Sequence, residues 1–137
     1  MDDTTTGSCL CGAVTFRVTG AFERFFLCHC SRCRKDTGSA HAANLFATAA
    51  RLDWLTGADN VGRFRLPGTR HEKSFCRTCG SALPTVQDAG AGAVLVVPAG
   101  ALDGPVDLTP AAKICYADRA GWVDGLDRVP TLDGLPG

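Results

Sequence analysis

Seven of the eight cysteines in this chain fall in three short clusters, and their spacing constrains the fold more than any other feature. The clusters are Cys9 and Cys11 in CLCG, Cys28, Cys30 and Cys33 in CHCSRC, and Cys76 and Cys79 in CRTCG, while Cys115 stands alone. Such an enrichment requires either disulfide bonds or bound metal. Close CxC and CxxC partners suit one metal ion better than strained local disulfides. The spacing therefore predicts metal binding.

Two of the clusters share a glycine directly after their second cysteine, Gly12 and Gly80. Glycine adopts positive φ without strain, so each turn is able to aim backbone N–H groups at the sulfurs. Two such turns make the two halves of a tetrahedral zinc site. We therefore expect Cys9, Cys11, Cys76 and Cys79 to form one closed, structural zinc site that joins an N-terminal turn to a distant loop.

The middle cluster differs, because it offers three sulfurs within six residues and has no glycine after its last cysteine. Three protein ligands leave one position open for water or substrate, whereas four fill a structural site. Cys28, Cys30 and Cys33 are thus the candidate ligands of a catalytic zinc. The alternative is a fourth protein ligand, from His29, His41, His71 or Cys115, which would close this site as well.

The pattern between the clusters predicts a mainly β chain that forms a single domain over residues 1–137. Val14, Phe16 and Val18 alternate with polar residues, which is typical of a half-buried strand. Further short strands are predicted over 25–27, 42–48, 52–55, 61–66 and 93–97, separated by turn residues. Ser31 is the predicted N-cap of one short helix that runs through Lys35 and is stopped by Gly38.

Composition and charge exclude several classes of function. The longest apolar stretch, residues 91–101, is too short to span a bilayer, and the segment MDDTTTGS lacks the features of a signal peptide. We therefore expect a cytoplasmic protein with no membrane partner. Fourteen basic and fourteen acidic residues balance, which argues against a nucleic-acid partner.

The charge is uneven along the chain. Residues 17–36 carry five basic and two acidic groups, and residues 63–77 carry five basic and one acidic group. These cations either offset the charge of metal-bound thiolates or recruit an anionic substrate. Arg32, Arg34 and Lys35, beside the three-cysteine motif, are the candidate contacts for substrate carboxylates, or else solvated helix charges.

The remaining candidate residues have plainer interpretations. His29 is expected to point away from the metal and to serve packing, while His41 and His71 are expected on the surface or in loops. Cys115 is predicted to be a small buried residue, and Trp54 and Trp122 to be core or edge-covering aromatics.

The segments GSCLCGAVTF, CHCSRCRKDTGSA, FCRTCGSAL and DRAGW, in this order, resemble the glutathione-dependent formaldehyde-activating enzyme family, whose relatives include centromere protein V domains. The resemblance covers about residues 7–130. It implies an antiparallel β-tent fold and two Zn²⁺ per chain. By position, Cys9, Cys11, Cys76 and Cys79 match the structural ligands, and Cys28, Cys30 and Cys33 match the catalytic ligands at which the thiol of glutathione binds.

The resemblance implies a carbon–sulfur lyase that acts on adducts of glutathione, or a similar thiol, with an aldehyde such as formaldehyde. The adduct is of the S-hydroxymethylglutathione type. The rival hypothesis is a noncatalytic zinc-stabilised β-tent module that binds a protein partner. An exchangeable fourth ligand at the second zinc separates the two.

Overall fold

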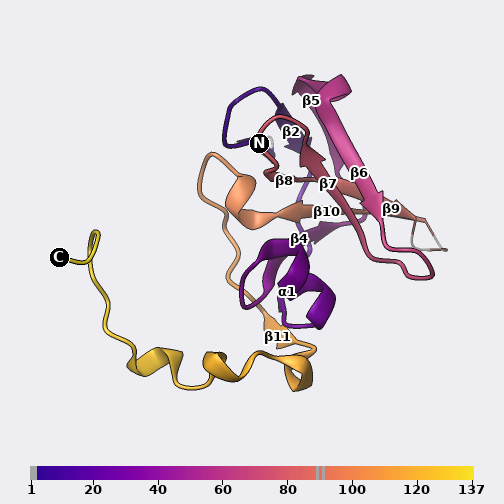
Figure 1. Cartoon of the computed structure of the whole chain (residues 1–137). Coiled ribbons are helices and arrows are strands. Elements are labelled where there is room, and N and C mark those ends of the chain that lie inside the picture. The colour runs from indigo at the N-terminus through magenta and orange to yellow at the C-terminus, as the bar shows by residue number, and fades with distance from the viewer. Residues whose placement is uncertain (1–2, 89, 91) are drawn as a thin grey trace.

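A computed structural model describes residues 3–88, 90 and 92–137 of the chain and confirms a mainly β architecture. In Figure 1 the short strands pack together into one body, and a short helix lies beside it. The C-terminal segment extends away from that body. Within the described residues, no helix is long and apolar enough to cross a membrane.

The strands form three sheets. The first contains β1 (Thr4–Ser8), β2 (Thr15–Thr19) and β5 (Arg51–Thr56), in that order. The second contains β11 (Ala112–Ile114), β3 (Arg24–Cys28), β4 (Ala42–Ala47), β10 (Ala93–Pro98) and β9 (Thr85–Asp88). The third contains β6 (Val61–Arg65), β7 (Glu72–Cys76) and β8 (Ala82–Leu83). Neighbouring strands are antiparallel except for the parallel pair β11–β3.

The core is built from the inward faces of these sheets. Phe16 and Val18 alternate with half-buried neighbours along β2, as predicted from the period-two pattern, and both are fully buried. They pack with Leu45 of β4 and Val97 of β10 in one cluster. A Cβ at Gly7, the β1 residue opposite Phe16, would overlap the Phe16 ring, so only glycine allows the two strands to pack this closely.

The single α-helix, α1, spans Ser31–Thr37 and follows β3 directly. Its N-cap is Cys30, not Ser31 as the sequence predicted. Cys30 has an extended backbone, and its Sγ accepts a hydrogen bond from the Cys33 N–H at 3.3 Å. Gly38 ends the helix as expected: at φ 64° its N–H donates to the Arg34 carbonyl.

Five single-turn 3₁₀ segments occur within the described residues. They are η1 (Ala58–Asn60), η2 (Ala99–Ala101), η3 (Tyr116–Asp118), η4 (Gly121–Val123) and η5 (Leu126–Arg128). The last three follow β11 and form much of the C-terminal segment in Figure 1, coloured yellow.

Candidate functional site

Four cysteines from distant parts of the chain meet in one place. The sulfurs of Cys9, Cys11, Cys76 and Cys79 all lie within 4.8 Å of one another. Cys9 and Cys11 belong to the turn between β1 and β2, whereas Cys76 ends β7 and Cys79 lies in the turn before β8. The fold therefore brings together the two pairs that the sequence predicts as partners. We call this set the four-cysteine cluster.

The spacing of these sulfurs fits a tetrahedral zinc ion. The Cys9–Cys11 and Cys11–Cys76 sulfur distances are 3.6 and 3.8 Å. A tetrahedron with Zn–S bonds of about 2.3 Å has sulfurs about 3.8 Å apart. The donor set and its dimensions therefore suit a closed zinc site.

The two turns have the backbone expected of zinc-binding loops. Gly12 and Gly80 adopt φ of 81° and 78°, in the region that favours glycine. The N–H of Val14 donates to Cys9 Sγ at 3.3 Å, and the Asn60 Nδ2 donates to Cys76 Sγ at 3.5 Å. Donors aimed at sulfur stabilise negative charge on it, so the loops are prepared for thiolates.

Ser81 connects the two turns. Its Oγ accepts a hydrogen bond from the Leu10 N–H at 2.9 Å and lies 3.2 Å from Cys79 Sγ. Its side-chain and backbone hydrogen bonds lower the pKa of Cys79 to about 5. Ser81 is thus a supporting residue that the sequence reasoning missed, although its position directly after CRTCG was available as a signal.

The pKa values of the thiols in the four-cysteine cluster shift in opposite directions. The Ala13 N–H lowers the pKa of Cys11, but the neighbouring Cys9, Cys79 and Cys76 thiols outweigh it and raise that pKa to about 11. Opposite shifts in one cluster mean that the four thiolates do not coexist without a compensating cation. A divalent metal supplies that charge.

The second set, the three-cysteine cluster, lies where β3 passes into α1. The sulfurs of Cys28, Cys30 and Cys33 lie within 4.8 Å of one another. Burial raises the pKa of Cys33, and the nearby Cys30 and Cys28 raise it further, whereas hydrogen bonds led by the Cys33 N–H outweigh burial and lower the pKa of Cys30. Across the described ranges, no fourth cysteine, histidine or carboxylate joins these three.

None of the four residues considered as a fourth ligand has a ligand atom that joins the three sulfurs. His29 is 2% exposed, and its ring lies 5.0 Å from both the His41 and the Tyr116 ring, measured between centroids. This agrees with the predicted packing role. His71 Nε2 pairs with Asp36 Oδ2 at 2.8 Å. Cys115 is exposed, so its predicted burial is wrong, and its left-handed backbone (φ 52°) places it in a turn rather than in the core.

Of the two predictions for tryptophan residues, one is confirmed and the other is wrong. Trp54 packs against the core in an edge-to-face contact with Phe16, at a centroid distance of 6.1 Å, as predicted. Trp122 is 62% exposed, so its prediction as a core or edge-covering aromatic is wrong. The physical reason is that Trp122 lies in the C-terminal segment, which leaves the body after η3.

Burial and cationic neighbours keep His29 neutral. Burial lowers its pKa most, and His41, Lys113 and Arg119 lower it further. Lys113 and Arg119 both lie over the Tyr116 ring, at 5.4 and 4.5 Å from its centroid. Neither His29 ring nitrogen has a hydrogen-bond partner among the described residues. No pattern in the sequence indicated that His29, in the CHCSRC loop, would contact Tyr116, in the segment after β11.

The three predicted cationic contacts differ in burial. Arg32 and Lys35 are exposed on α1, whereas Arg34 is half-buried. The Arg34 Nε is buried and has no hydrogen-bond partner in the described part of the chain. A buried guanidinium donor without a partner is costly, so Arg34 is the cation of this helix best placed to gain from an anionic ligand.

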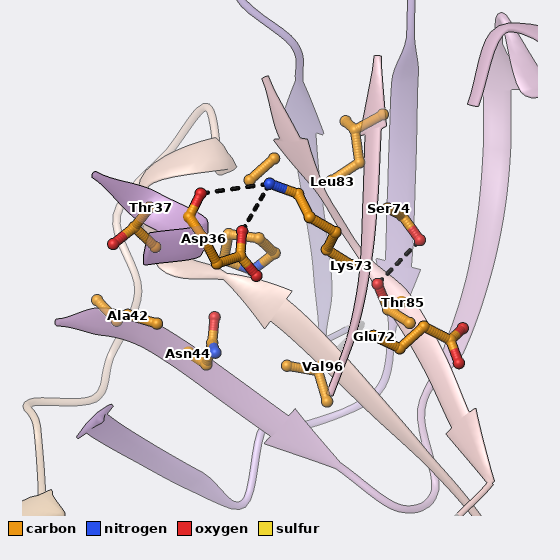
Figure 2. A pocket seen from close by; sticks show the side chains of 13 residues that line it. Asp36, Thr37, Ala42, Asn44, Glu72, Lys73, Ser74, Leu83, Thr85 and Val96 are labelled. Carbon is orange, nitrogen blue, oxygen red and sulfur yellow. Dashed lines mark hydrogen bonds and ion pairs between the residues drawn. The ribbon is translucent and has the colours of Figure 1, made fainter. Parts of the chain in front are cut away.

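A small pocket lies beside α1, and Figure 2 shows Lys73 reaching across it to Asp36. Lys73 Nζ lies 2.7 Å from Asp36 Oδ1, and His71 contacts the other oxygen of that carboxylate. The pocket volume is about 90 Å³. Drug-sized ligands occupy about 300–1,000 Å³, so this pocket does not hold a tripeptide. Its ion pairs instead connect α1 to the third sheet.

Comparison with known proteins identifies the family to which this chain is similar. A sequence model of the family described as "Glutathione-dependent formaldehyde-activating enzyme" matches residues 4–118, which include every cysteine of both clusters. The chain belongs to this family.

Two similar proteins extend the comparison. A Halomonas elongata protein, named provisionally as a glutathione-dependent formaldehyde-activating enzyme, is 41% identical over 86 residues, which cover 56% of this chain and 52% of that protein. This chain thus spans about half the length of that curated relative. A crystal structure of a Rhodobacter sphaeroides protein matches with a TM-score of 0.56 and 28% identity, over 74% of this chain and 91% of that one.

Proposed function

We propose that this chain is a zinc-dependent carbon–sulfur lyase that acts on glutathione–aldehyde adducts of the S-hydroxymethylglutathione type. The observation that carries the proposal is the three-cysteine cluster, in which three sulfurs converge and no fourth side chain of the described residues joins them. Family membership supports glutathione-dependent aldehyde handling as the setting.

Each cluster has its own role in this proposal. Cys9, Cys11, Cys76 and Cys79 would hold a structural zinc that fixes β7 against the β1–β2 turn, and Cys28, Cys30 and Cys33 would hold the catalytic one. Zinc bound by three thiolates supplies a position at which a substrate thiol loses its proton near neutral pH. The cysteines of the second cluster therefore act as ligands rather than as nucleophiles.

Cationic residues of α1 would bind the carboxylates of the thiol. Arg34 carries the argument, since its buried Nε has no partner among the described residues, while Arg32 and Lys35 are exposed on the same helix. Glutathione carries two carboxylates, and guanidinium groups bind carboxylates with paired hydrogen bonds. Carboxylates bound by these cations would hold the substrate in one orientation, with its sulfur directed at the metal site.

The proposed reaction needs no oxidant or reductant. In the forward direction the C–S bond of the adduct breaks, the hydroxyl group becomes the aldehyde carbonyl, and its proton is transferred to sulfur. In the reverse direction sulfur attacks the carbonyl carbon, and the oxygen takes up a proton. We place this chemistry in the cytoplasm, where thiols remain reduced.

Exchange NMR with glutathione and formaldehyde tests the proposal. The zinc-loaded protein should accelerate exchange between free glutathione and its adduct above the uncatalysed rate. Cys30→Ser should abolish the acceleration, whereas Cys115→Ser, at an exposed cysteine outside both clusters, should retain it. Exchange at the uncatalysed rate with fully zinc-loaded protein would contradict the lyase and favour the noncatalytic module.

A further inference from the structure

The C-terminal segment, residues 119–137, exposes an unusual number of large apolar side chains. We call it the arm. Of the nine large hydrophobic residues exposed in the described part of the chain, five lie here: Trp122 (62% exposed), Leu126 (47%), Val129 (55%), Leu132 (64%) and Leu135 (94%). Apolar surface gathered in this way marks a contact with another molecule.

The arm lies beyond the part of the chain that the family model matches. The family match ends at residue 118, and Figure 1 shows the arm running away from the sheets. Its apolar residues recur every three or four positions, and Val123 alone among them is buried. The only helical turns in the described arm are η4 and η5, and its own residues leave most of these apolar side chains exposed. The arm therefore needs a surface outside itself.

A suitable surface exists where the three sheets end side by side. β5, β6 and β9 are each the outermost strand of their sheet within the described residues. They border a groove of about 220 Å³ lined by Leu52, Trp54, Ala58, Val61, Arg63, Ser74, Pro84 and Val86. Edge strands offer unpaired backbone groups, and extended segments commonly pair with them.

The arm has a small excess of negative charge, and the surroundings of this groove have a small excess of positive charge. The arm contains three carboxylates, Asp124, Asp127 and Asp133, and two cations, Arg119 and Arg128, of which Arg119 pairs with Asp124. Beside the groove, a neighbouring depression shares Arg63 with it and adds the cations Arg65 and Arg70 and the carboxylates Glu72 and Asp88. Arg63 pairs with Glu72, so Arg65 and Arg70 are the cations of this depression that face one remaining carboxylate. This difference in net charge favours the association of the two surfaces over the association of two like surfaces.

We propose that the occupant of the groove is the arm of a second copy of this chain. Figure 1 places the arm at the end of the molecule that holds β11, whereas β5 and β6 lie at the opposite end, so the arm in this position does not cover its own groove. In a two-fold dimer, each arm occupies the groove of its partner.

The size of such a contact suits a stable dimer. Each copy contributes the arm and the eight residues that line the groove. Stable interfaces use about 20–30 residues on each side, and the aromatic residues in them carry much of the binding energy. Trp122 is the aromatic anchor of this arm. The inference is independent of the proposed chemistry, because it uses neither cysteine cluster.

Sedimentation equilibrium of the full-length, zinc-loaded protein tests the proposal. The chain should be a dimer, and both an arm variant (Trp122→Ser with Leu132→Ser) and a groove variant (Val86→Asp) should raise the dissociation constant at least tenfold. Asp107→Asn alters an exposed residue outside the arm, the groove and both cysteine clusters, and should leave the constant unchanged. Circular dichroism and zinc content should be normal in all variants, because these side chains are exposed.

Mixing the two weakened variants separates arm exchange from other dimers. A heterodimer retains one intact arm and one intact groove, so the mixture should associate more strongly than either variant alone. A monomer at all concentrations would overturn the proposal, and so would a dimer that the arm substitutions leave intact. A monomer in which Trp122 is shielded from a soluble quencher would place the arm on its own body instead, and would also overturn it.

Discussion

Cys11 and Cys76 are 65 positions apart in the chain, yet their sulfurs lie 3.8 Å from each other. This approach closes a loop that contains β2 to β7, including the whole three-cysteine cluster. Holding such a loop closed opposes a large chain entropy. A metal ion at the four-cysteine cluster would therefore stabilise the fold on which the other cluster depends.

The first prediction concerns metal content. The protein purified without chelator or oxidant should contain two zinc ions per chain, because the two sets of sulfurs are separate and each is compact. Elemental analysis measures this ratio. A reproducible value near one would remove one of the two sites.

The second prediction concerns the unequal roles of the clusters. Cys79→Ser should unfold much of the domain, since structural zinc contributes roughly 10 kcal/mol or more to folding. Cys30→Ser should lose one zinc ion and keep the strand content, because its cluster is local to the β3–α1 junction. Circular dichroism and metal analysis of both variants, with Cys115→Ser as the control, test this. Equal collapse of Cys79→Ser and Cys30→Ser would contradict the division.

The spacing of the cysteines allowed both clusters to be predicted because metal ligands in turns are a local pattern. Strands with a clear alternation of apolar and polar residues, such as the one that contains Phe16 and Val18, could also be predicted from the sequence. β7 was not predicted, because EKSFC mixes charged and apolar residues and acquires its strand conformation by pairing with β6 and β8.

Other features depend on tertiary contacts that no local sequence pattern predicts. Cys115 was predicted to be buried on the statistics of free cysteines, but it occupies a left-handed turn. The contacts of the His29 ring with the His41 and Tyr116 rings join three segments of the chain. Trp122 was expected to be covered, yet its own chain leaves it exposed. Such outcomes follow from tertiary packing rather than from propensity.

The third prediction concerns pH and zinc binding at the four-cysteine cluster. Hydrogen bonds with Ser81 lower the pKa of Cys79 to about 5, so this thiol readily loses its proton and binds metal as the thiolate. Ser81→Ala should raise that pKa, and protons should then displace zinc at a higher pH than in the wild type. Zinc affinity at neutral pH should fall by about tenfold or more.

Zinc release measured against pH with a chromophoric indicator tests this third prediction. Ser39→Ala alters an exposed serine outside the cluster and is the matched control. An unchanged midpoint of zinc release in Ser81→Ala would contradict the role assigned to the hydroxyl group.

The fourth prediction concerns the attachment of α1 to the third sheet. Asp36 pairs with both Lys73 and His71, and its side chain is only 16% exposed. Asp36→Asn should lower the free energy of unfolding by about 1–3 kcal/mol, because it removes charged hydrogen bonds from a mostly buried place. Chemical denaturation of the zinc-loaded protein measures the change. Asp107→Asn, at an exposed position, should have no effect, and equal stability of the two variants would show that the ion pairs are unimportant.

The central claim is that a substrate thiol completes the coordination of a metal held by Cys28, Cys30 and Cys33, and cobalt(II) substitution tests it most directly. Cobalt reports its ligands in the visible spectrum, so titration with glutathione should change the absorption of the wild-type protein as a fourth thiolate binds. Cys30→Ser should not show this change, whereas Cys115→Ser should show it fully. A spectrum that glutathione leaves unaltered, in protein with cobalt bound at both clusters, would contradict the account.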